Sequence, residues 1–357
     1  MTQLSLPPFT GDRWPWRGGD LQTVRNSFLG PPQKPRRQTD TAATAEDAGR
    51  YELPMDDGTG DHLVAYLDLP NHANNAEHHG PRPLVVLIHG LTGCSGSAYI
   101  LSAAAAFQEA GYRVLRLNLR GAGPSRATCT GQYHAGRSED LHRVLNALPK
   151  MIGPGLTEQG VLLVGYSLGA NMLLKYLGEC GSGVRGKALV PVHAAVSVSA
   201  PVDLKETCFR FLEARNALYQ RYLLSRMRLE SVSGAAVVSS GHRAAIEAAR
   251  TVLAFDDGFV APANGYTDAF DYYQQCSAKH FINAIRIPTL ILHAQDDPWI
   301  PMSAYGGLES DPANDRHVLL TRSGGHVGFH AAGHKRPWSD RAMVRFFDEK
   351  REGSEAL

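Results

Sequence analysis

The sequence of 357 residues has no excess of either charge, with 36 Lys and Arg against 35 Asp and Glu. Nucleic-acid-binding proteins usually carry a basic surface, so this balance argues against that class. The chain also lacks the run of about 18 apolar residues that a membrane-spanning helix needs. Residues 1–9 lack the basic start and apolar stretch of a secretory signal. We therefore expect a soluble, cytoplasmic protein with no nucleic-acid partner and no transmembrane segment.

Cysteine is sparse, with five scattered residues and no C-x-x-C pair. A zinc knuckle or a redox pair would need such a spacing, so neither is indicated and no metal or cofactor is expected. An odd count leaves at least one free thiol, which suits a reducing compartment. The cysteines are Cys94, Cys129, Cys180, Cys208 and Cys276.

One aromatic cluster, Trp14-Pro15-Trp16, permits contact with a membrane surface. Buried aromatic rings are far commoner than membrane anchors, so we expect the two indoles to pack on the protein's own core. Peripheral membrane contact stays open, as does the oligomeric state.

Short apolar runs alternate with helical patterns along most of the chain. Residues 84–88 form a continuous apolar run, which is typical of a strand buried on both faces. The alternation predicts an α/β fold with a mostly parallel central sheet and helices on both faces. Strands are expected at residues 84–88, 112–118, 161–164, 194–198, 289–292 and 317–320, and helices at 98–110, 138–150, 170–177 and 341–350. Residues 203–281 interrupt this rhythm with a largely helical pattern, which indicates an inserted cap.

The first chemical signal is Gly165-Tyr166-Ser167-Leu168-Gly169, between an apolar strand and a helical stretch. A serine on such a tight strand-to-helix turn exposes its hydroxyl, and flanking glycines avoid collisions with neighbouring elements. The pattern predicts that Ser167 is a nucleophile. The alternative is a structural turn serine.

A second loop, His89-Gly90-Leu91-Thr92-Gly93, follows the strand at residues 84–88. Acyl transfer needs N–H donors for the oxyanion of the tetrahedral intermediate. We expect one donor from Leu168, the residue after the nucleophile, and the other from Leu91, with Thr92 as the alternative. His89 is expected to brace the loop.

Candidates for the base and the acid follow the last two predicted strands. His326 follows Ser323-Gly324-Gly325, and a glycine-flanked loop at a strand end can deliver a base to the serine. His330 and His334 follow at spacings that permit a rival metal site, although the nearby glycines disfavour the continuous helix it would need. For the acid, a carboxylate of Asp296 or Asp297 can accept from the imidazole N–H. Asp297 is preferred, with Asp296 as the next candidate and Asp203 as a further one, and the unused neighbour is expected to make turn hydrogen bonds. Serine, aspartate and histidine then follow in the chain order that this kind of fold uses.

With these motifs in view, the sequence resembles the YheT-like branch of α/β-hydrolases, predicted carboxylesterases related to mammalian α/β-hydrolase domain lipases. The resemblance implies that the acid lies in a D-D-P turn, matched by Asp297, and the histidine in G-G-H-x-G-F, matched by Gly324 to Phe329. Asp20 departs from the pattern where a histidine is expected, so no role is carried over to it. The other matching segments are Gly19 to Thr23, Asn118 to Gly121, Tyr133 to Gly136 with Glu139-Asp140, and Asp271 to Tyr273.

The resulting expectation is an α/β-hydrolase core at residues 1–202 and 282–357, with an N-terminal extension, and a helical cap at 203–281. The expected reaction is hydrolysis of short- to medium-chain acyl esters or glycerides through an acyl-enzyme. Acyl transfer and a non-catalytic binding protein are the alternatives. The cap should lie over Ser167 and set substrate choice. Four of its aromatics are candidates for an acyl pocket, although each alone is more often packing: Phe209, Phe211, Tyr219 and Tyr222.

Overall fold

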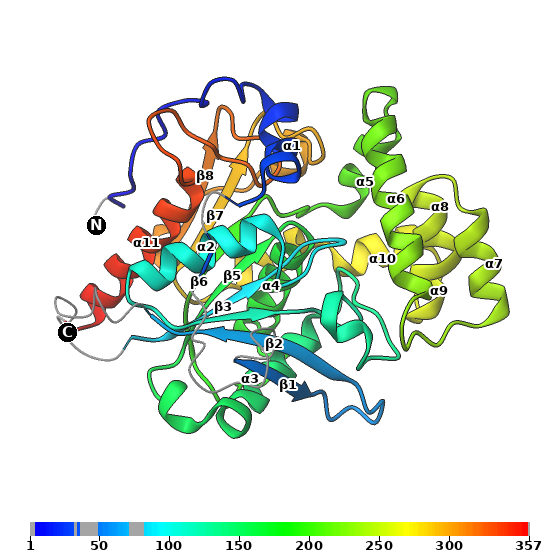
Figure 1. Ribbon diagram of the computed structural model, residues 1–357, viewed down its shortest axis with the longest axis horizontal. Coiled ribbons are helices and arrows are strands. Elements are labelled where there is room, and N and C mark those ends of the chain that lie inside the picture. Colours follow the sequence, from blue (N-terminus) through cyan, green and yellow to red (C-terminus); the bar gives the residue numbers. More distant parts are fainter. Residues whose placement is uncertain (1–3, 32–33, 36–48, 71–81, 356–357) are drawn as a thin grey trace.

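The computed structural model describes residues 4–31, 34–35, 49–70 and 82–355. Its centre is an eight-stranded sheet in the order β1-β2-β4-β3-β5-β6-β7-β8 (Figure 1). The pairs from β4 to β8 are parallel, while β1 and β2 run antiparallel at one edge. The strands are β1 (Arg50–Pro54), β2 (His62–Asp68), β3 (Leu84–Ile88), β4 (Val114–Leu117), β5 (Val161–Tyr166), β6 (Val192–Val198), β7 (Thr289–Ala294) and β8 (Arg316–Thr321).

Helices cover both faces of this sheet, as predicted. Alternate residues of β3 enter two separate cores: Val86 joins one and Val85 the other. The first core contains α3 and α4, and the second contains α2 and α11. This explains why β3 is apolar at every position rather than at every second one. The helices flanking the sheet are α2 (Ala98–Glu109), α3 (Ser138–Ile152), α4 (Leu168–Gly181) and α11 (Trp338–Glu355).

All six expected strands and four expected helices are confirmed, most of them one to four residues longer or shorter than predicted. The sequence analysis missed β1, β2 and the N-terminal helix α1 (Gly19–Leu29). The strand β1 is only partly buried and has no continuous apolar run, whereas β2 was missed although its residues 63–67 are all apolar.

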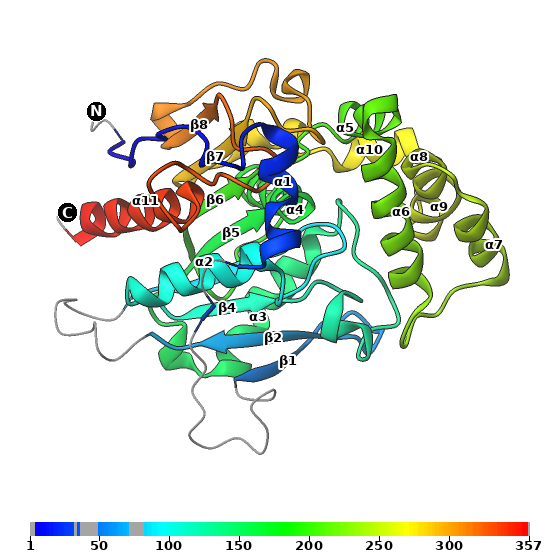
Figure 2. The ribbon, with the colours of Figure 1, turned by 45° about the horizontal axis from the view of Figure 1, so that its top comes forward.

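A group of short helices follows β6 and lies beyond the ends of the strands, to one side of the sheet (Figures 1 and 2). Two small apolar clusters hold it together, and both also contact the rest of the chain, one through Ala135 and the other through Leu91 and Trp299. Residues 278–284 pack instead against α4, where a side chain on Gly178 would collide with the Phe281 carbonyl. The helices are α5 (Leu204–Leu212), α6 (Ala217–Val232), α7 (Ser240–Ala248), α8 (Val252–Phe255), the π-helix η5 (Asp256–Val260), α9 (Ala261–Ala263) and α10 (Ala269–Cys276).

The aromatic cluster before α1 differs from expectation. The side chain of Trp14 is 75% exposed, so the prediction that both indoles pack on the core was wrong for this ring. Trp16 is half-buried. None of the helices in the described ranges is long and apolar enough to cross a membrane.

Candidate active site

Ser167 lies on a sharp turn between β5 and α4. Its φ of 51° lies in the left-handed region, which a serine rarely adopts, and its N–H donates to the Val198 carbonyl of the neighbouring strand at 2.9 Å. Both flanking glycines are required. A Cβ on Gly165 would lie 2.7 Å from the Cα of Ala170, and one on Gly169 would lie 2.3 Å from the His89 carbonyl. The predicted collisions are therefore confirmed.

His326 lies on the loop after β8, which backbone hydrogen bonds hold in place. The N–H of Gly325 donates to Asp296 at 2.9 Å, and the N–H of His326 donates to the Thr23 hydroxyl at 2.8 Å. The next N–H, of Val327, donates to the Ser199 hydroxyl at 3.2 Å. Three successive N–H groups thus bind three separate side chains, which fixes the direction of the imidazole.

The imidazole connects the serine to a buried carboxylate. Nε2 of His326 lies 2.9 Å from Oγ of Ser167, and Nδ1 lies 2.9 Å from Oδ2 of Asp297. The other Asp297 oxygen accepts from the N–H groups of Trp299 and Ile300. The structure therefore brings Ser167, His326 and Asp297 into a single chain of hydrogen bonds.

Burial opposes the ionised form of Asp297, whose side chain is 0% exposed. The adjacent His326 and the backbone N–H of Trp299 favour the ionised form, and the net effect lowers the pKa of Asp297. An ionised carboxylate can stabilise the imidazolium that forms when the base takes a proton.

The other two candidate acids have different partners. Burial raises the pKa of Asp296, whose carboxylate accepts from Gly325 rather than from the imidazole. Asp203 caps the N-terminus of α5 by accepting from Glu206 and forms an ion pair with Lys279. Neither carboxylate is hydrogen-bonded to His326.

Two backbone N–H groups beside Ser167 are available as oxyanion donors. Within the described ranges, the N–H groups of Leu91 and Leu168 have no hydrogen-bond partner. The N–H of Thr92, in contrast, donates to the Tyr133 hydroxyl at 2.7 Å. This geometry favours Leu91 over Thr92. Gly90 lets the loop approach, because a Cβ there would lie 2.8 Å from the Ser167 Cβ.

His89 braces the same loop, as expected. Its Nδ1 lies 2.8 Å from the Gly90 carbonyl, and its Nε2 accepts from the N–H of Leu119 at 3.0 Å. Complete burial lowers the pKa of His89 to about 4, so the ring is neutral at physiological pH.

The rival metal site lacks its scaffold. Residues 322–337 form turns and loops, so His326, His330 and His334 do not share a helical face. His330 is buried, and its N–H donates to the Gln22 side chain. Among the described residues, no three His, Cys, Asp or Glu side chains are grouped to hold a metal ion.

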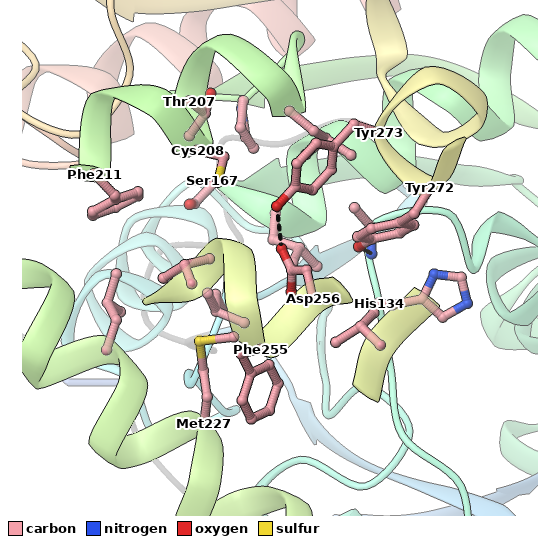
Figure 3. Close-up of a pocket in the computed structure, with 18 of the residues that line it drawn as sticks. His134, Ser167, Thr207, Cys208, Phe211, Met227, Phe255, Asp256, Tyr272 and Tyr273 are labelled. Carbon is pink, nitrogen blue, oxygen red and sulfur yellow. Dashed lines mark hydrogen bonds between the residues drawn. The ribbon is translucent and has the colours of Figure 1, made fainter. Parts of the chain in front are cut away.

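A pocket extends from Ser167, Leu91 and His326 into the helices that follow β6 (Figure 3). Its wall is mainly apolar. The helices after β6 contribute Leu204, Phe211, Leu223, Met227, Val252 and Phe255.

Of the four aromatics proposed for this pocket, only Phe211 lines it. Phe209 and Tyr222 are 40% and 51% exposed, because they lie on the outward sides of α5 and α6. Tyr219 packs on Trp299 with its hydroxyl donating to Asp20. Three of the four candidates therefore lie outside the pocket lining, and the expectation that a single ring more often packs than lines the pocket fits Tyr219.

Sequence reasoning missed Trp299 and the roles of α1. The Trp299 ring stacks on His326 at 4.4 Å between centroids and also contacts Phe211 of the cap. On α1, Thr23 accepts from His326, while Asp20 binds Arg215 of the cap at 3.1 Å. The match of Gly19 to Thr23 to the YheT-like pattern was the only sequence feature that pointed to α1, and it did not indicate which residues α1 contacts.

Comparison with known proteins identifies the family. The family model described as the alpha/beta hydrolase fold matches residues 83–331. The Escherichia coli protein named "Putative esterase YheT" is 35% identical over 291 residues, which cover 78% of this chain and 77% of that protein. A Saccharomyces cerevisiae monoacylglycerol lipase is 29% identical over 282 residues, covering 74% of this chain and 59% of that protein.

A solved structure, the Pyrococcus furiosus esterase Pf2001, superposes with a TM-score of 0.53 at 16% identity. The match covers 89% of this chain and 97% of that one, and it supports the fold alone. The chain belongs to the YheT-like group of the α/β-hydrolase family, and it is a hydrolase of the esterase and lipase type.

Proposed function

We propose that this protein hydrolyses carboxylic esters through an acyl-enzyme on Ser167. Its hydroxyl attacks the acyl carbonyl while His326 takes the hydroxyl proton, and Asp297 stabilises the resulting imidazolium. The single observation that carries the proposal is the pair of 2.9 Å contacts joining these three residues at one end of the pocket.

The N–H groups of Leu91 and Leu168 would bind the oxyanion of the tetrahedral intermediate. Support comes from their unpaired state in the described ranges and from their position beside Ser167 in the pocket. Preorganised donors of this kind usually contribute a large share of the rate enhancement in acyl transfer. The protonated His326 then releases its proton to the leaving alcohol. Water, activated by the same imidazole, clears the acyl group from Ser167.

We further infer that the substrates are short- to medium-chain acyl esters or glycerides. The apolar wall formed by the cap suits an acyl chain, and one relative is named a monoacylglycerol lipase. In this proposal residues 203–281 act as the substrate-selecting cap of a core formed by residues 1–202 and 282–357.

The test combines a fluorophosphonate probe with p-nitrophenyl esters of graded chain length. Ser167→Ala should lose probe labelling and about 10⁴-fold or more in kcat, because the nucleophile is removed. The exposed cap variant Ser225→Ala is a matched control and should keep both. Activity of Ser167→Ala within a few-fold of wild type would remove the assignment. Formation of a new ester in the presence of an added alcohol would identify acyl transfer.

A further inference from the structure

One carboxyl group interrupts the apolar wall of the pocket. Asp256 is the first residue of η5 in the cap, it lines the pocket, and its residue surface is only 8% exposed. Figure 3 shows its carboxyl group beside Tyr273, in the same pocket as Ser167. Asp256 has no role in the proposed hydrolysis mechanism.

The hydrogen bonds of Asp256 are incomplete. Its Oδ2 accepts from the Tyr273 hydroxyl at 2.7 Å, whereas its Oδ1 has no partner in the parts of the chain that the structure describes. No ion pair with a described Lys or Arg is present either. Elsewhere in the molecule, the buried carboxylates of Asp61 and Asp140 both bind Arg120.

The second carboxyl group in the pocket wall is differently placed. Glu230 accepts from the Tyr133 hydroxyl at 2.9 Å, and burial raises its pKa to about 7 although Arg226 and Arg126 oppose this. For Asp256 no described arginine or lysine opposes the effect of burial, and only Tyr273 does so. Burial raises the pKa of Asp256 to about 7, which reflects the cost of an ionised group in an apolar wall.

A purely structural role, holding Tyr273, accounts for only one of the two carboxyl oxygens of Asp256. Bracing Tyr273 requires one acceptor oxygen, which a neutral asparagine would supply without an ionisable group. The remaining oxygen is an unpaired acceptor that is open to the cavity rather than fully enclosed. A ligand that brings a hydrogen-bond donor to this position would satisfy it.

We propose that Asp256 is a specificity-determining residue that binds a hydroxyl or ammonium group on the part of the ester lying against the cap. The inference rests on the proposed function and names its substrate class: esters that carry a hydrogen-bond donor besides the reacting group. The donor would bind Oδ1 while Tyr273 holds Oδ2. A site built to bind a hydroxyl discriminates strongly against the analogue without it, because the site's polar atom is then left unpaired.

The test measures ratios of kcat/KM between matched esters. One series compares 2-hydroxyethyl and 2-aminoethyl esters with the propyl ester of the same acid. The other compares ω-hydroxyacyl esters with their methyl-terminated analogues. We expect wild type to prefer a donor-bearing ester in one series by roughly 10-fold or more. Asp256→Leu should reduce that ratio to about one, whereas Asp257→Asn, which changes the adjacent acid outside the pocket lining, should retain it.

Asp256→Asn distinguishes a hydroxyl donor from an ammonium donor. It also provides a second test if Asp256→Leu does not fold. With the amide oxygen held by Tyr273, the NH2 group takes the position of Oδ1, where it can donate to a hydroxyl but not to an ammonium. A hydroxyl preference should therefore persist in part, while an ammonium preference is lost. A kcat/KM ratio of about one in both series for wild type would overturn the proposal. A preference that is unchanged in Asp256→Leu would also overturn it. Probe labelling of Ser167 in each variant reports the triad separately, so failure of this inference is distinguishable from failure of the proposed hydrolysis.

Discussion

Asp296 and Asp297 are neighbours in the chain, but their carboxylates bind different parts of the His326 loop. Asp297 binds the imidazole, while Asp296 binds the backbone N–H of Gly325. The sequence alone predicts an acid in this turn, because the turn follows a strand and precedes two prolines. The assignment of the two side chains depends on how the loop after β8 returns across the turn, which no local pattern encodes.

Exchanging each carboxylate for an amide should separate the two roles. Asp297→Asn should lower kcat on the order of 10⁴-fold, because an amide cannot stabilise imidazolium and favours the wrong tautomer. Asp296→Asn should cost about 10-fold or less, since its amide oxygen can still accept from Gly325. Steady-state kinetics on a p-nitrophenyl ester measures both. A reversed ranking would move the acid to Asp296.

The same limit applies to the oxyanion loop. A glycine-containing loop after β3 is evident from the sequence, but the choice between Leu91 and Thr92 is not. The structure favours Leu91 because the Tyr133 hydroxyl, about 40 residues further along the chain, accepts the Thr92 N–H. Tertiary contacts of this kind decide which atoms are free.

At the level of elements, the inner strands β3 and β5 were predictable because their apolar runs are continuous and alternate with helical patterns. The edge strand β1 has one buried residue among five and gave no such run, whereas β2, which lies between β1 and β4, was missed although its residues 63–67 are apolar. The helix α1 has a mixed surface, with Gln22 buried and Phe28 75% exposed. Its function in holding Thr23 against the histidine loop depends on that packing and was not predictable.

The cap gives an element-scale prediction because its aromatics divide into two groups. Phe211 and Met227 line the pocket and are each 6% exposed, whereas Phe209 and Tyr222 face outward. Phe211→Ala or Met227→Ala should enlarge the acyl space and shift the preferred p-nitrophenyl ester by about two carbons or more towards longer chains. Each should also destabilise the protein by roughly 2–4 kcal/mol, as large-to-small core changes do.

Phe209→Ala and Tyr222→Ala are the matched controls, since they remove large side chains from the same two helices. The kcat/KM profile across chain lengths should stay that of wild type in both. If all four variants keep the wild-type profile, the helices after β6 do not select the acyl chain.

Across the whole molecule, ionisable groups are buried at several sites remote from the triad. Asp340 of α11 is 2% exposed and accepts from the Ser102 hydroxyl of α2 at 2.6 Å. This contact joins the two helices that cover one face of the sheet. Burial raises the pKa of Asp340 from 3.8 to about 7, against the weaker opposing effects of the Ser102 hydrogen bond and of Arg336. The sequence predicted both helices but gave no indication of a carboxyl group between them.

This buried carboxyl should make the stability of the fold depend on pH with a definite sign. Below about pH 4, Asp340 is protonated in both the folded and the unfolded chain. Between about pH 4 and 7 the unfolded chain releases the proton first. The folded chain then holds more protons, so the free energy of unfolding falls as pH rises and levels off above the folded pKa. Asp340→Asn removes this titration, while its amide oxygen can still accept from Ser102.

The difference in unfolding free energy between Asp340→Asn and wild type should therefore increase in favour of the variant, by on the order of 1–3 kcal/mol from about pH 5 to 8. Urea unfolding followed by tryptophan fluorescence at several pH values measures it. Glu352→Gln, which removes an exposed carboxylate from the same helix, controls for the loss of one negative charge. Parallel stability curves for Asp340→Asn and wild type over that range would mean that Asp340 titrates alike in the folded and unfolded chains. The contact between α2 and α11 would then tolerate an ionised carboxylate.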